Sequence, residues 1–224
     1  MNNPPFFTIL TTSLNNGSII HKTLDSIRNQ SFHDLEHIVV DGGSSDQTLE
    51  ILKIYQNTDN MTWISEPDKG IADALNKGLK LARGRYVLVI QADDALLNSK
   101  TLAHVCSIIK TEVFDIWAFP VTWNSSLQSK TTVRPFRLLW WHRFRNIFPH
   151  QGVFVHRRVF DRIGRFNKRF LISMDYDFFY RALLSRHSFK FETMPVASIG
   201  RDGVSSREKY WPYRLNEEFS IQDL

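Results

Sequence analysis

The sequence predicts an α/β fold built around a mostly parallel central sheet. Over the first hundred residues, short apolar runs alternate with segments whose apolar residues recur at helical spacing. This alternation is typical of parallel strands joined by right-handed helical crossovers. One apolar run, Tyr86–Ile90, has the composition of a buried central strand, and the acidic residues Asp93 and Asp94 follow it closely. Because ligands gather at the carboxyl ends of such strands, the acidic pair predicts a divalent-metal site.

The first half of the chain is predicted to contribute four strands and three helices. Runs rich in β-branched and aromatic residues are the predicted strands, at 6–12, 36–41, 61–65 and 86–90. Ser18 and Asp46 are the predicted N-caps of the first two helices, because both side chains can accept a hydrogen bond from the first turn. The residues expected to face the core from the three helices are Ile20, Leu24 and Ile27, then Leu49, Leu52 and Tyr55, then Ala72, Leu75 and Leu79.

The regular alternation stops after residue 121. The elements predicted beyond the fourth strand are a helix after Ser99, a strand at 116–121, a hairpin with its turn at 123–127 and its return strand at 131–133, a strand at 152–156, a helix at 175–185, a strand at 189–192 and a polar helix from Glu208. No repeat or low-complexity tract divides the sequence. We therefore expect a single domain with a regular first half and a more irregular second half.

Composition excludes several classes of protein. A hydrophobic fraction of 42% and a charged fraction of 23% argue against disorder. The net charge of +5 favours anionic partners such as nucleotides, phosphates or anionic lipids. The single cysteine, Cys106, excludes an intrachain disulfide and a multi-cysteine zinc site. No apolar run reaches the length of a membrane span or a signal sequence, so we expect a cytoplasmic protein, with attachment to the inner face of the cell membrane left open.

Asp41 ends the second predicted strand, directly before a loop of two glycines and two serines. Such a loop lets a ligand approach the backbone closely, and an acidic residue at this position typically binds a ribose or a base. The structural alternative is that Asp41 only forms the turn, by accepting hydrogen bonds from its own loop. The glycine-rich signatures of dinucleotide-binding and P-loop domains are both missing, which disfavours those two classes.

Three motifs in order give the sequence a specific resemblance. They are VVDGGSSD at Val39–Asp46, SEPDKGIADALNKG at Ser65–Gly78 and ADD at Ala92–Asp94. Together with Pro149–Gln151 and Met174–Phe178, they resemble glycosyltransferase family 2, in the bacterial group that builds surface polysaccharides. Any one of these motifs alone would be weak, whereas five in the same order are specific.

The resemblance implies a GT-A fold, which is a three-layer α/β sandwich with a nucleotide-binding first half. Residues 1–98 would bind the nucleotide sugar, 99–207 would form the acceptor and catalytic half, and 208–224 would be a C-terminal tail. The implied reaction is an inverting transfer from a UDP-, GDP- or dTDP-sugar to a hydroxyl of a saccharide acceptor, which we expect to be lipid-linked. The expected process is synthesis of capsule, exopolysaccharide or O-antigen.

The resemblance also assigns the donor-binding residues. Thr11 and Asp41 match positions used around the base and ribose, and the loop residues Asp68 and Lys69 match positions beside the base. In the acidic pair, Asp94 is expected on the metal, and Asp93 on the metal or nearer the donor sugar. The expected cofactor is Mg²⁺ or Mn²⁺, since a departing diphosphate develops negative charge that a divalent cation can neutralise.

Asp175 matches the general base of the family. An acceptor hydroxyl becomes a good nucleophile when a carboxylate takes its proton, and Asp175 opens a predicted helix whose dipole favours the ionised form. Asp177 is the alternative base, and helix capping is the structural alternative for Asp175. His150 is expected either to contact the diphosphate or complete the metal shell, or to pack as an ordinary buried histidine.

The basic and aromatic stretch 136–145 is a candidate for recognising a lipid-linked acceptor at the membrane surface. The alternative is an aromatic core whose arginines reach solvent. No nucleic acid partner is expected, because the basic residues are dispersed. Two other functions stay open at this stage: a non-catalytic sugar-nucleotide-binding subunit of a polysaccharide assembly complex, and a nucleotidyltransferase, which is disfavoured because the glycine-rich loop after the first strand is missing.

Overall fold

The computed structural model describes residues 3–56, 61–124, 130–200 and 208–223. Seven strands from both halves of the chain form one sheet, in the order β10-β6-β9-β4-β1-β2-β3. Their bounds are β1 (Phe7–Ser13), β2 (Leu35–Asp41), β3 (Met61–Ser65), β4 (Tyr86–Val89), β6 (Ile116–Ala118), β9 (Val153–His156) and β10 (Phe189–Phe191). Strand β9 runs antiparallel to β4 and β6, and the other neighbours are parallel. The predicted mostly parallel sheet is confirmed.

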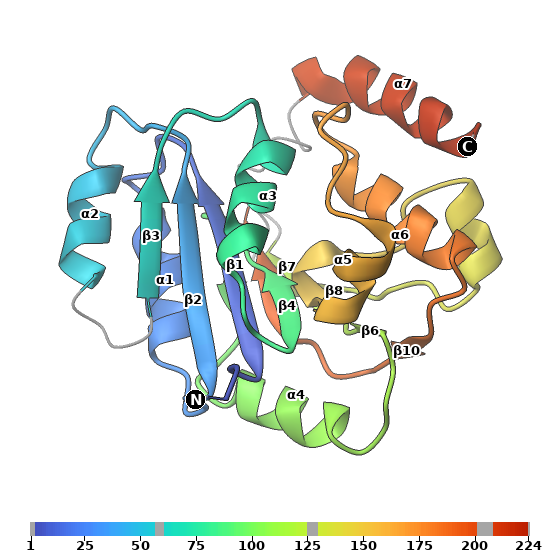
Figure 1. Cartoon of the computed structure of the whole chain (residues 1–224), viewed down its shortest axis with the longest axis horizontal. Coiled ribbons are helices and arrows are strands. Elements are labelled where there is room, and N and C mark those ends of the chain that lie inside the picture. The colour runs from blue at the N-terminus through green and yellow to red at the C-terminus, as the bar shows by residue number, and fades with distance from the viewer. Residues whose placement is uncertain (1–2, 57–60, 125–129, 201–207, 224) are drawn as a thin grey trace.

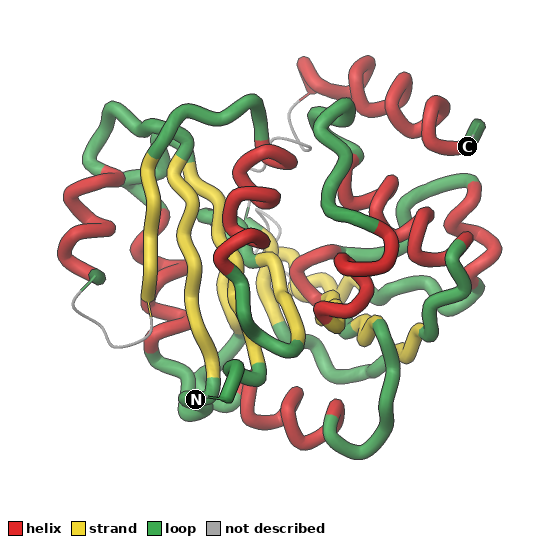
Figure 2. Tube along the Cα trace, viewed as in Figure 1, coloured by secondary structure: helices red, strands yellow, loops and turns green. Residues whose placement is uncertain are grey.

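Helices cover both faces of this sheet (Figures 1 and 2). On one face lie α3 (Ile71–Leu81), α5 (Arg157–Ile163) and α6 (Met174–Leu184), and on the other lie α1 (Ile20–Arg28), α2 (Thr48–Tyr55) and α4 (Thr101–Ile109). Alternate residues of β1 divide between the two cores, with Leu10 packed toward α3 and Ile9 toward α4. Gly78 allows α3 to approach the sheet, since a Cβ there would lie 2.1 Å from Leu10 Cδ1. The three-layer architecture is therefore confirmed.

The second half adds a smaller sheet of four strands in the order β5-β11-β7-β8. Its strands are β5 (Ala95–Leu96), β7 (Val121–Asn124), β8 (Lys130–Val133) and β11 (Ala197–Ile199). The predicted single strand at 116–121 is wrong, because the chain leaves the large sheet after Ala118 and enters the small one at Val121. Pro120 lies at this change of sheet, where its lack of an N–H prevents it from continuing a ladder. The predicted hairpin is confirmed as the antiparallel β7–β8 pair. Of its predicted turn at 123–127, Trp123 and Asn124 belong to strand β7, and 125–127 lie outside the described residues.

The helix starts differ in part from the prediction. Ser18 is not the cap of α1, because the Asn16 carbonyl accepts the N–H groups of Ile19 and Ile20 in its place. Asp46 does accept the N–H of Thr48 at the start of α2, at 2.9 Å, although the helix begins one residue later than predicted. The predicted C-terminal helix is present as the single turn η4 (Glu208–Tyr210) and α7 (Trp211–Gln222). Within the described ranges, no helix has the length and apolar character needed to cross a lipid bilayer.

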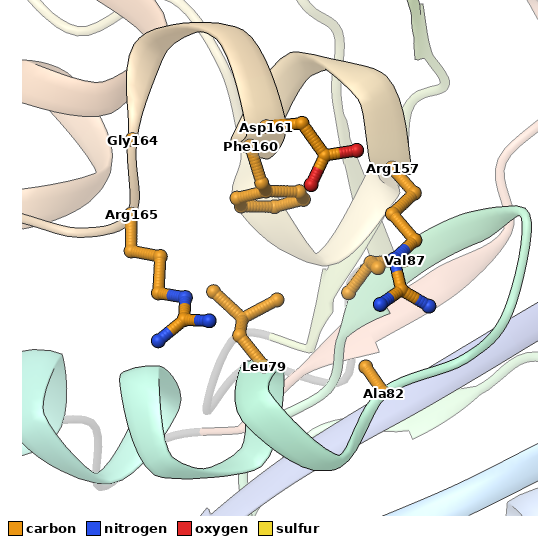
Figure 3. Close-up of a pocket in the computed structure, with 8 residues that line it drawn as sticks. All are labelled: Leu79, Ala82, Val87, Arg157, Phe160, Asp161, Gly164 and Arg165. Carbon is orange, nitrogen blue, oxygen red and sulfur yellow. The ribbon is translucent and has the colours of Figure 1, made fainter.

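A pocket of about 260 Å³ lies between α3, β4 and α5 (Figure 3). Arg157 and Arg165 flank it, and Leu79 and Ala82 form its apolar floor. None of the site residues predicted from the sequence lines this pocket. The candidate functional site is therefore elsewhere, at the carboxyl ends of the parallel strands.

Candidate functional site

The parallel register of the first strands brings the predicted binding loops to one edge of the sheet. Asp41 at the end of β2 pairs with Ser13 of β1 and Ser65 of β3. β4 is parallel to β1, so the acidic pair that follows it leaves the sheet at the same edge. The loops that bear Asp41, Asp68 and the acidic pair therefore share one side of the molecule, as predicted for a doubly wound sheet.

Asp41 is completely buried and organises the loop that follows it. Its Oδ2 accepts hydrogen bonds from the N–H groups of Gly43 and Ser44, at 3.0 and 2.8 Å, and from the Ser65 hydroxyl at 2.7 Å. Its Oδ1 accepts one from the Ser44 hydroxyl. The carboxylate therefore receives four hydrogen bonds from the protein itself, three on Oδ2 and one on Oδ1. The turn-forming role, left open by the sequence, is thus present, and direct contact between Asp41 and a ligand stays a prediction.

Asp68 lies against the same loop. A Cβ on Gly42 would be 2.4 Å from Asp68 Oδ2, so the glycine makes room for this carboxylate. Asp68 Oδ1 accepts the N–H of Gly70 at 2.8 Å, which fixes the turn before α3. Lys69 is exposed beside it, and its N–H donates to Asp73 at 3.1 Å. The loops after β2 and β3 therefore meet, with an exposed cation next to them.

Thr11 lies apart from these loops, inside the sheet. It is completely buried, and its hydroxyl is 3.0 Å from His37 Nε2 on the neighbouring strand. Burial lowers the pKa of His37 to about 3, so the imidazole is neutral at physiological pH. The side chain of Thr11 thus supports the floor of the site and has no exposed surface with which to contact a ligand.

The acidic pair is held by the end of strand β11. Asp94 is only 3% exposed, and its Oδ1 accepts the N–H of Gly200 at 2.9 Å. Burial raises the pKa of the Asp94 carboxyl above its ordinary value, although the nearby His150 and the Gly200 N–H act in the opposite direction. Asp93 packs on the same glycine, since a Cβ on Gly200 would lie 2.0 Å from Asp93 Cγ. A glycine is therefore required where β11 meets the pair.

His150 is positioned between the two groups of carboxylates by a short helical turn, η2 (His150–Gly152). Its Nδ1 is 3.5 Å from Asp175 Oδ2. Burial alone would lower the pKa of His150, but Asp175 and Asp94 raise it above the ordinary value for histidine. Its Nε2 is buried and has no hydrogen-bond partner among the described residues. A buried ring nitrogen with no partner, on a histidine whose pKa is raised, is suited to an anionic ligand.

Asp175 occupies the first turn of α6. Its Oδ1 accepts the N–H of Tyr176 at 2.8 Å, and its Oδ2 accepts the Asn146 amide at 2.9 Å. Burial opposes ionisation, yet His150, the Tyr176 N–H and Asn146 together hold the pKa of Asp175 below its ordinary value. The carboxylate is therefore ionised at neutral pH and keeps lone pairs for a further partner.

The alternative base, Asp177, has a structural role. It is 1% exposed and forms an ion pair with Arg181 one turn later, at 2.8 Å. Arg181 also donates to the carbonyls of Ile163 and Arg165, at 2.7 and 2.8 Å. Asp177 and Arg181 thus tie α6 to the end of α5 and the segment after it.

Glu217 on α7 is a site-supporting residue that the sequence did not reveal. Its carboxylate accepts three successive N–H groups, from Leu171, Ile172 and Ser173, at 2.5, 2.9 and 2.8 Å. These groups immediately precede α6, so Glu217 fixes the segment that leads into the helix that carries Asp175. No local pattern could have shown this contact, because it joins segments more than forty positions apart.

The side chains that could coordinate a metal ion at this site fit a cation that a bound ligand also coordinates. Asp93, Asp94 and His150 offer two carboxylates and one imidazole, but no three or more His, Cys, Asp or Glu side chains in the described parts of the chain are arranged to hold a cation alone. Mg²⁺ at nucleotide sites commonly takes one or two carboxylates and completes its shell with phosphate oxygens and water. Such a cation would favour the ionised form of the Asp94 carboxyl and so oppose the effect of burial, which raises its pKa.

Comparison with known proteins gives a consistent family assignment. The family model described as glycosyl transferase family 2 matches residues 8–179. A protein of Mycobacterium tuberculosis named "PGL/p-HBAD biosynthesis glycosyltransferase" is 33% identical over 192 residues, which cover 82% of this chain and 73% of that protein. A second protein of the same species, named as an uncharacterized glycosyltransferase, is 29% identical and covers 82% of this chain and 71% of its own length.

Solved structures share the fold. TarS residues 1–349 from S. aureus, in complex with UDP-GlcNAc, match 97% of this chain with a TM-score of 0.74 and 21% identity. A mannosyltransferase from Pyrobaculum calidifontis, in complex with GDP-Man and Mn²⁺, matches 99% of this chain with a TM-score of 0.74 and 20% identity. The chain spans 67% and 64% of those two structures.

Proposed function

Because the chain belongs to glycosyltransferase family 2, we propose that it moves a sugar, with inversion, from a nucleotide-diphosphate donor to a hydroxyl of a saccharide acceptor. One observation carries this proposal. At the edge of the sheet where Asp93 and the buried Asp94 lie, Asp94 and the ionised Asp175 both interact electrostatically with His150, whose Nε2 has no hydrogen-bond partner among the described residues. Such a network suits a diphosphate on one side and a hydroxyl that loses a proton on the other.

In the proposed complex, the acidic pair and His150 hold the diphosphate end of the donor. Mg²⁺ or Mn²⁺ on Asp94 and Asp93 would neutralise the charge that develops on the departing diphosphate. His150 directs its Nε2 to a phosphate oxygen, which supplies the partner that this nitrogen lacks within the described residues.

The nucleoside would lie over the loops after β2 and β3. Asp68 and Lys69 border this surface and are proposed to contact the base, whereas Asp41 shapes the loop that receives the ribose. We assign Thr11 to the floor beneath the nucleoside, since its side chain is completely buried. The solved relatives bind UDP-GlcNAc and GDP-Man, and we propose a UDP-, GDP- or dTDP-sugar for this chain.

Asp175 is the proposed general base. Its carboxylate takes the proton of the acceptor hydroxyl while the oxygen forms a bond to the anomeric carbon of the donor sugar. The bond from that carbon to the diphosphate breaks at the same time, and the diphosphate leaves with the bonding electrons. Attack from the side opposite the leaving group inverts the anomeric centre. The low pKa of Asp175 keeps it ionised before the reaction. The proposed acceptor is lipid-linked and belongs to capsule, exopolysaccharide or O-antigen synthesis.

A melting-temperature screen of nucleotide sugars tests donor binding. With a matching donor at about a hundredfold excess over its Kd, and with Mn²⁺, we expect stabilisation of about 2.7 kcal/mol. For a chain of this size, that corresponds to a rise of roughly 5–10 °C in Tm. EDTA should remove most of the rise. If no UDP-, GDP- or dTDP-sugar raises the Tm in the presence of Mn²⁺, the proposed donor class is wrong.

Glu217 is proposed as a positioning residue for Asp175, and its replacement should affect turnover more than donor binding. Glu217→Gln keeps the shape of the side chain but removes its charge and one acceptor oxygen, so the start of α6 loses hydrogen bonds. A displacement of about 1 Å at a catalytic group can cost about 100-fold, and we expect kcat to fall by about 10- to 100-fold. The donor Kd should stay within about twofold, a change of less than about 0.5 kcal/mol.

Glu218→Gln is the matched control for this prediction. Glu218 is the next residue of α7 and forms an ion pair with Arg214 on the same helix. The Glu218→Gln variant should leave both kcat and the donor Kd nearly unchanged. Equal effects of the two variants on kcat would contradict a specific role for Glu217.

A further inference from the structure

Apolar side chains gather on the surface beside Asp175 and point into solvent. The first part of this apolar surface surrounds the short helix η1 (Leu139–Arg143) and consists of four aromatic residues. We name it the aromatic knob, and its members are Phe136, Trp140, Trp141 and Phe144. The rings of Trp140 and Trp141 are 5.1 Å apart, and those of Trp141 and Phe144 are 5.8 Å apart. Trp140 is nevertheless 59% exposed, so the knob packs on itself and not into the core.

A buried histidine within the aromatic knob connects it to the helix that carries Asp175. His142 is completely buried, and its ring lies 4.9 Å from that of Tyr176. The Tyr176 hydroxyl donates to the Arg143 carbonyl at 3.1 Å, and Asn146 just beyond the knob donates to Asp175. The knob is therefore fixed directly to the first turn of α6, where Asp175 lies.

Helix α7 continues this surface with an apolar stripe made of Trp211, Leu215 and Phe219. These residues recur every four positions and so share one face of the helix. Each is more than half exposed, whereas Ile221 on the opposite side is buried and Glu217 holds the start of α6. A surface helix of a globular protein ordinarily turns its apolar face inward, but here the apolar stripe faces out.

The stripe and the knob meet at the end of α7. Gln222 lies three residues after Phe219, on the same face, and its amide donates to the Phe144 carbonyl at 3.0 Å. Figure 1 shows this end of α7 next to the segment that carries η1. The two parts therefore form one apolar surface, which is larger than the scattered apolar residues normal for a monomer.

The charge around the knob identifies the partner. Segment 134–145 contains the exposed arginines Arg134, Arg137, Arg143 and Arg145 and no acidic residue. Among the residues that the structure describes, none of the four forms an ion pair. A second copy meeting this surface about a two-fold axis would place arginines against arginines. Tryptophan, arginine and apolar residues together instead suit the headgroup region of an anionic bilayer.

We infer that the knob and the stripe form a docking surface for an anionic lipid membrane, which presents Asp175 to an acceptor anchored in that membrane. The part that concerns the acceptor rests on the proposed function. The docking surface itself does not rest on the proposed function. It follows from the exposed apolar residues and from the arginines that form no ion pair with any residue that the structure describes. For 136–145, it favours membrane contact over an aromatic core, because the four aromatic side chains are exposed whereas His142 is completely buried.

Co-sedimentation with vesicles tests this inference. We expect the full chain to bind phosphatidylcholine vesicles that contain ~30% phosphatidylglycerol at least about tenfold better than pure phosphatidylcholine vesicles, and 0.5 M NaCl should weaken the binding, at a Debye length of about 4 Å. Three double variants should each lower vesicle binding several-fold. They are Trp140→Ser with Phe144→Ser, Leu215→Ser with Phe219→Ser, and Arg134→Gln with Arg137→Gln.

The matched control is Ile54→Ser with Val113→Ser. These two residues are 71% and 67% exposed and lie outside the docking surface, so vesicle binding should be unchanged. All variants should keep the rise in Tm caused by the nucleotide sugar, so that loss of docking is distinguished from loss of the donor site. The inference is overturned if the wild type does not bind anionic vesicles, or if the control lowers binding as much as the docking variants. It is also overturned if the docking variants only convert a dimer to a monomer in the absence of lipid.

Discussion

Asp175→Asn is expected to slow sugar transfer by about 10²- to 10⁴-fold, the usual contribution of a general base. Asparagine keeps the volume and the acceptor oxygen that bonds the Tyr176 N–H, but it cannot take a proton at neutral pH. The donor is held by other residues, so its Kd should change by less than about threefold, which is under 0.7 kcal/mol. Release of nucleoside diphosphate measures turnover, and titration calorimetry measures donor affinity.

Asp177→Asn provides the contrast, because the two aspartates share one helix and differ in their partners. Removing the charge of the buried Asp177 leaves Arg181 without its ion pair, and we expect a loss of about 3 kcal/mol in the free energy of unfolding. Turnover of the folded fraction should be close to that of the wild type. The two roles would have to be exchanged if Asp175→Asn turned over at a near-normal rate while Asp177→Asn was stable but inactive.

Asp94→Asn is expected to abolish the effect of Mn²⁺ on donor binding. Asparagine retains an oxygen for the Gly200 N–H, so the end of β11 should stay in place. It lacks the negative charge that a divalent cation requires, and we expect donor affinity in Mn²⁺ to fall at least about tenfold, or 1.4 kcal/mol.

The wild type in EDTA is the internal reference for this second prediction. If the cation acts through Asp94, the variant with Mn²⁺ and the wild type without it should bind the donor with similar Kd values. Full enhancement of donor binding by Mn²⁺ in Asp94→Asn would show that the cation binds elsewhere. An unchanged Tm of the unliganded variant would show that the substitution leaves the fold intact.

The part of the fold that could be predicted is the part encoded by local patterns. Strands β1 to β4 are runs of several apolar or β-branched residues, and the loops after them carry the motifs that include Asp41 and Asp94. Some short elements of the second half carry too few residues for a period to be recognised. The three-residue strand β11 was missed, although it places Gly200 on the acidic pair, and the seven-residue helix α5 was missed for the same reason.

The sequence predicted which residues form the site only where those residues belong to motifs, and it did not predict their contacts. The sequence indicated Asp175 and His150 but not that His150 Nδ1 faces Asp175 across 3.5 Å, because that contact depends on how η2 and α6 pack. It left two roles open for Asp41, and only the hydrogen bonds from Gly43, Ser44 and Ser65 reveal how the loop uses this carboxylate. Contacts from the C-terminal helix, such as those of Glu217, follow from tertiary packing and have no local signature.

The most direct test of catalysis is the release of nucleoside diphosphate from the donor that the melting screen selects. It is measured by ion-exchange chromatography in the presence of Mn²⁺, with water and with a bacterial lipid extract as acceptors. We expect release that requires the protein and Mn²⁺, increases with the lipid extract and disappears in Asp175→Asn. Donor that binds but stays intact under both conditions would contradict this account and would indicate a non-catalytic sugar-nucleotide-binding subunit.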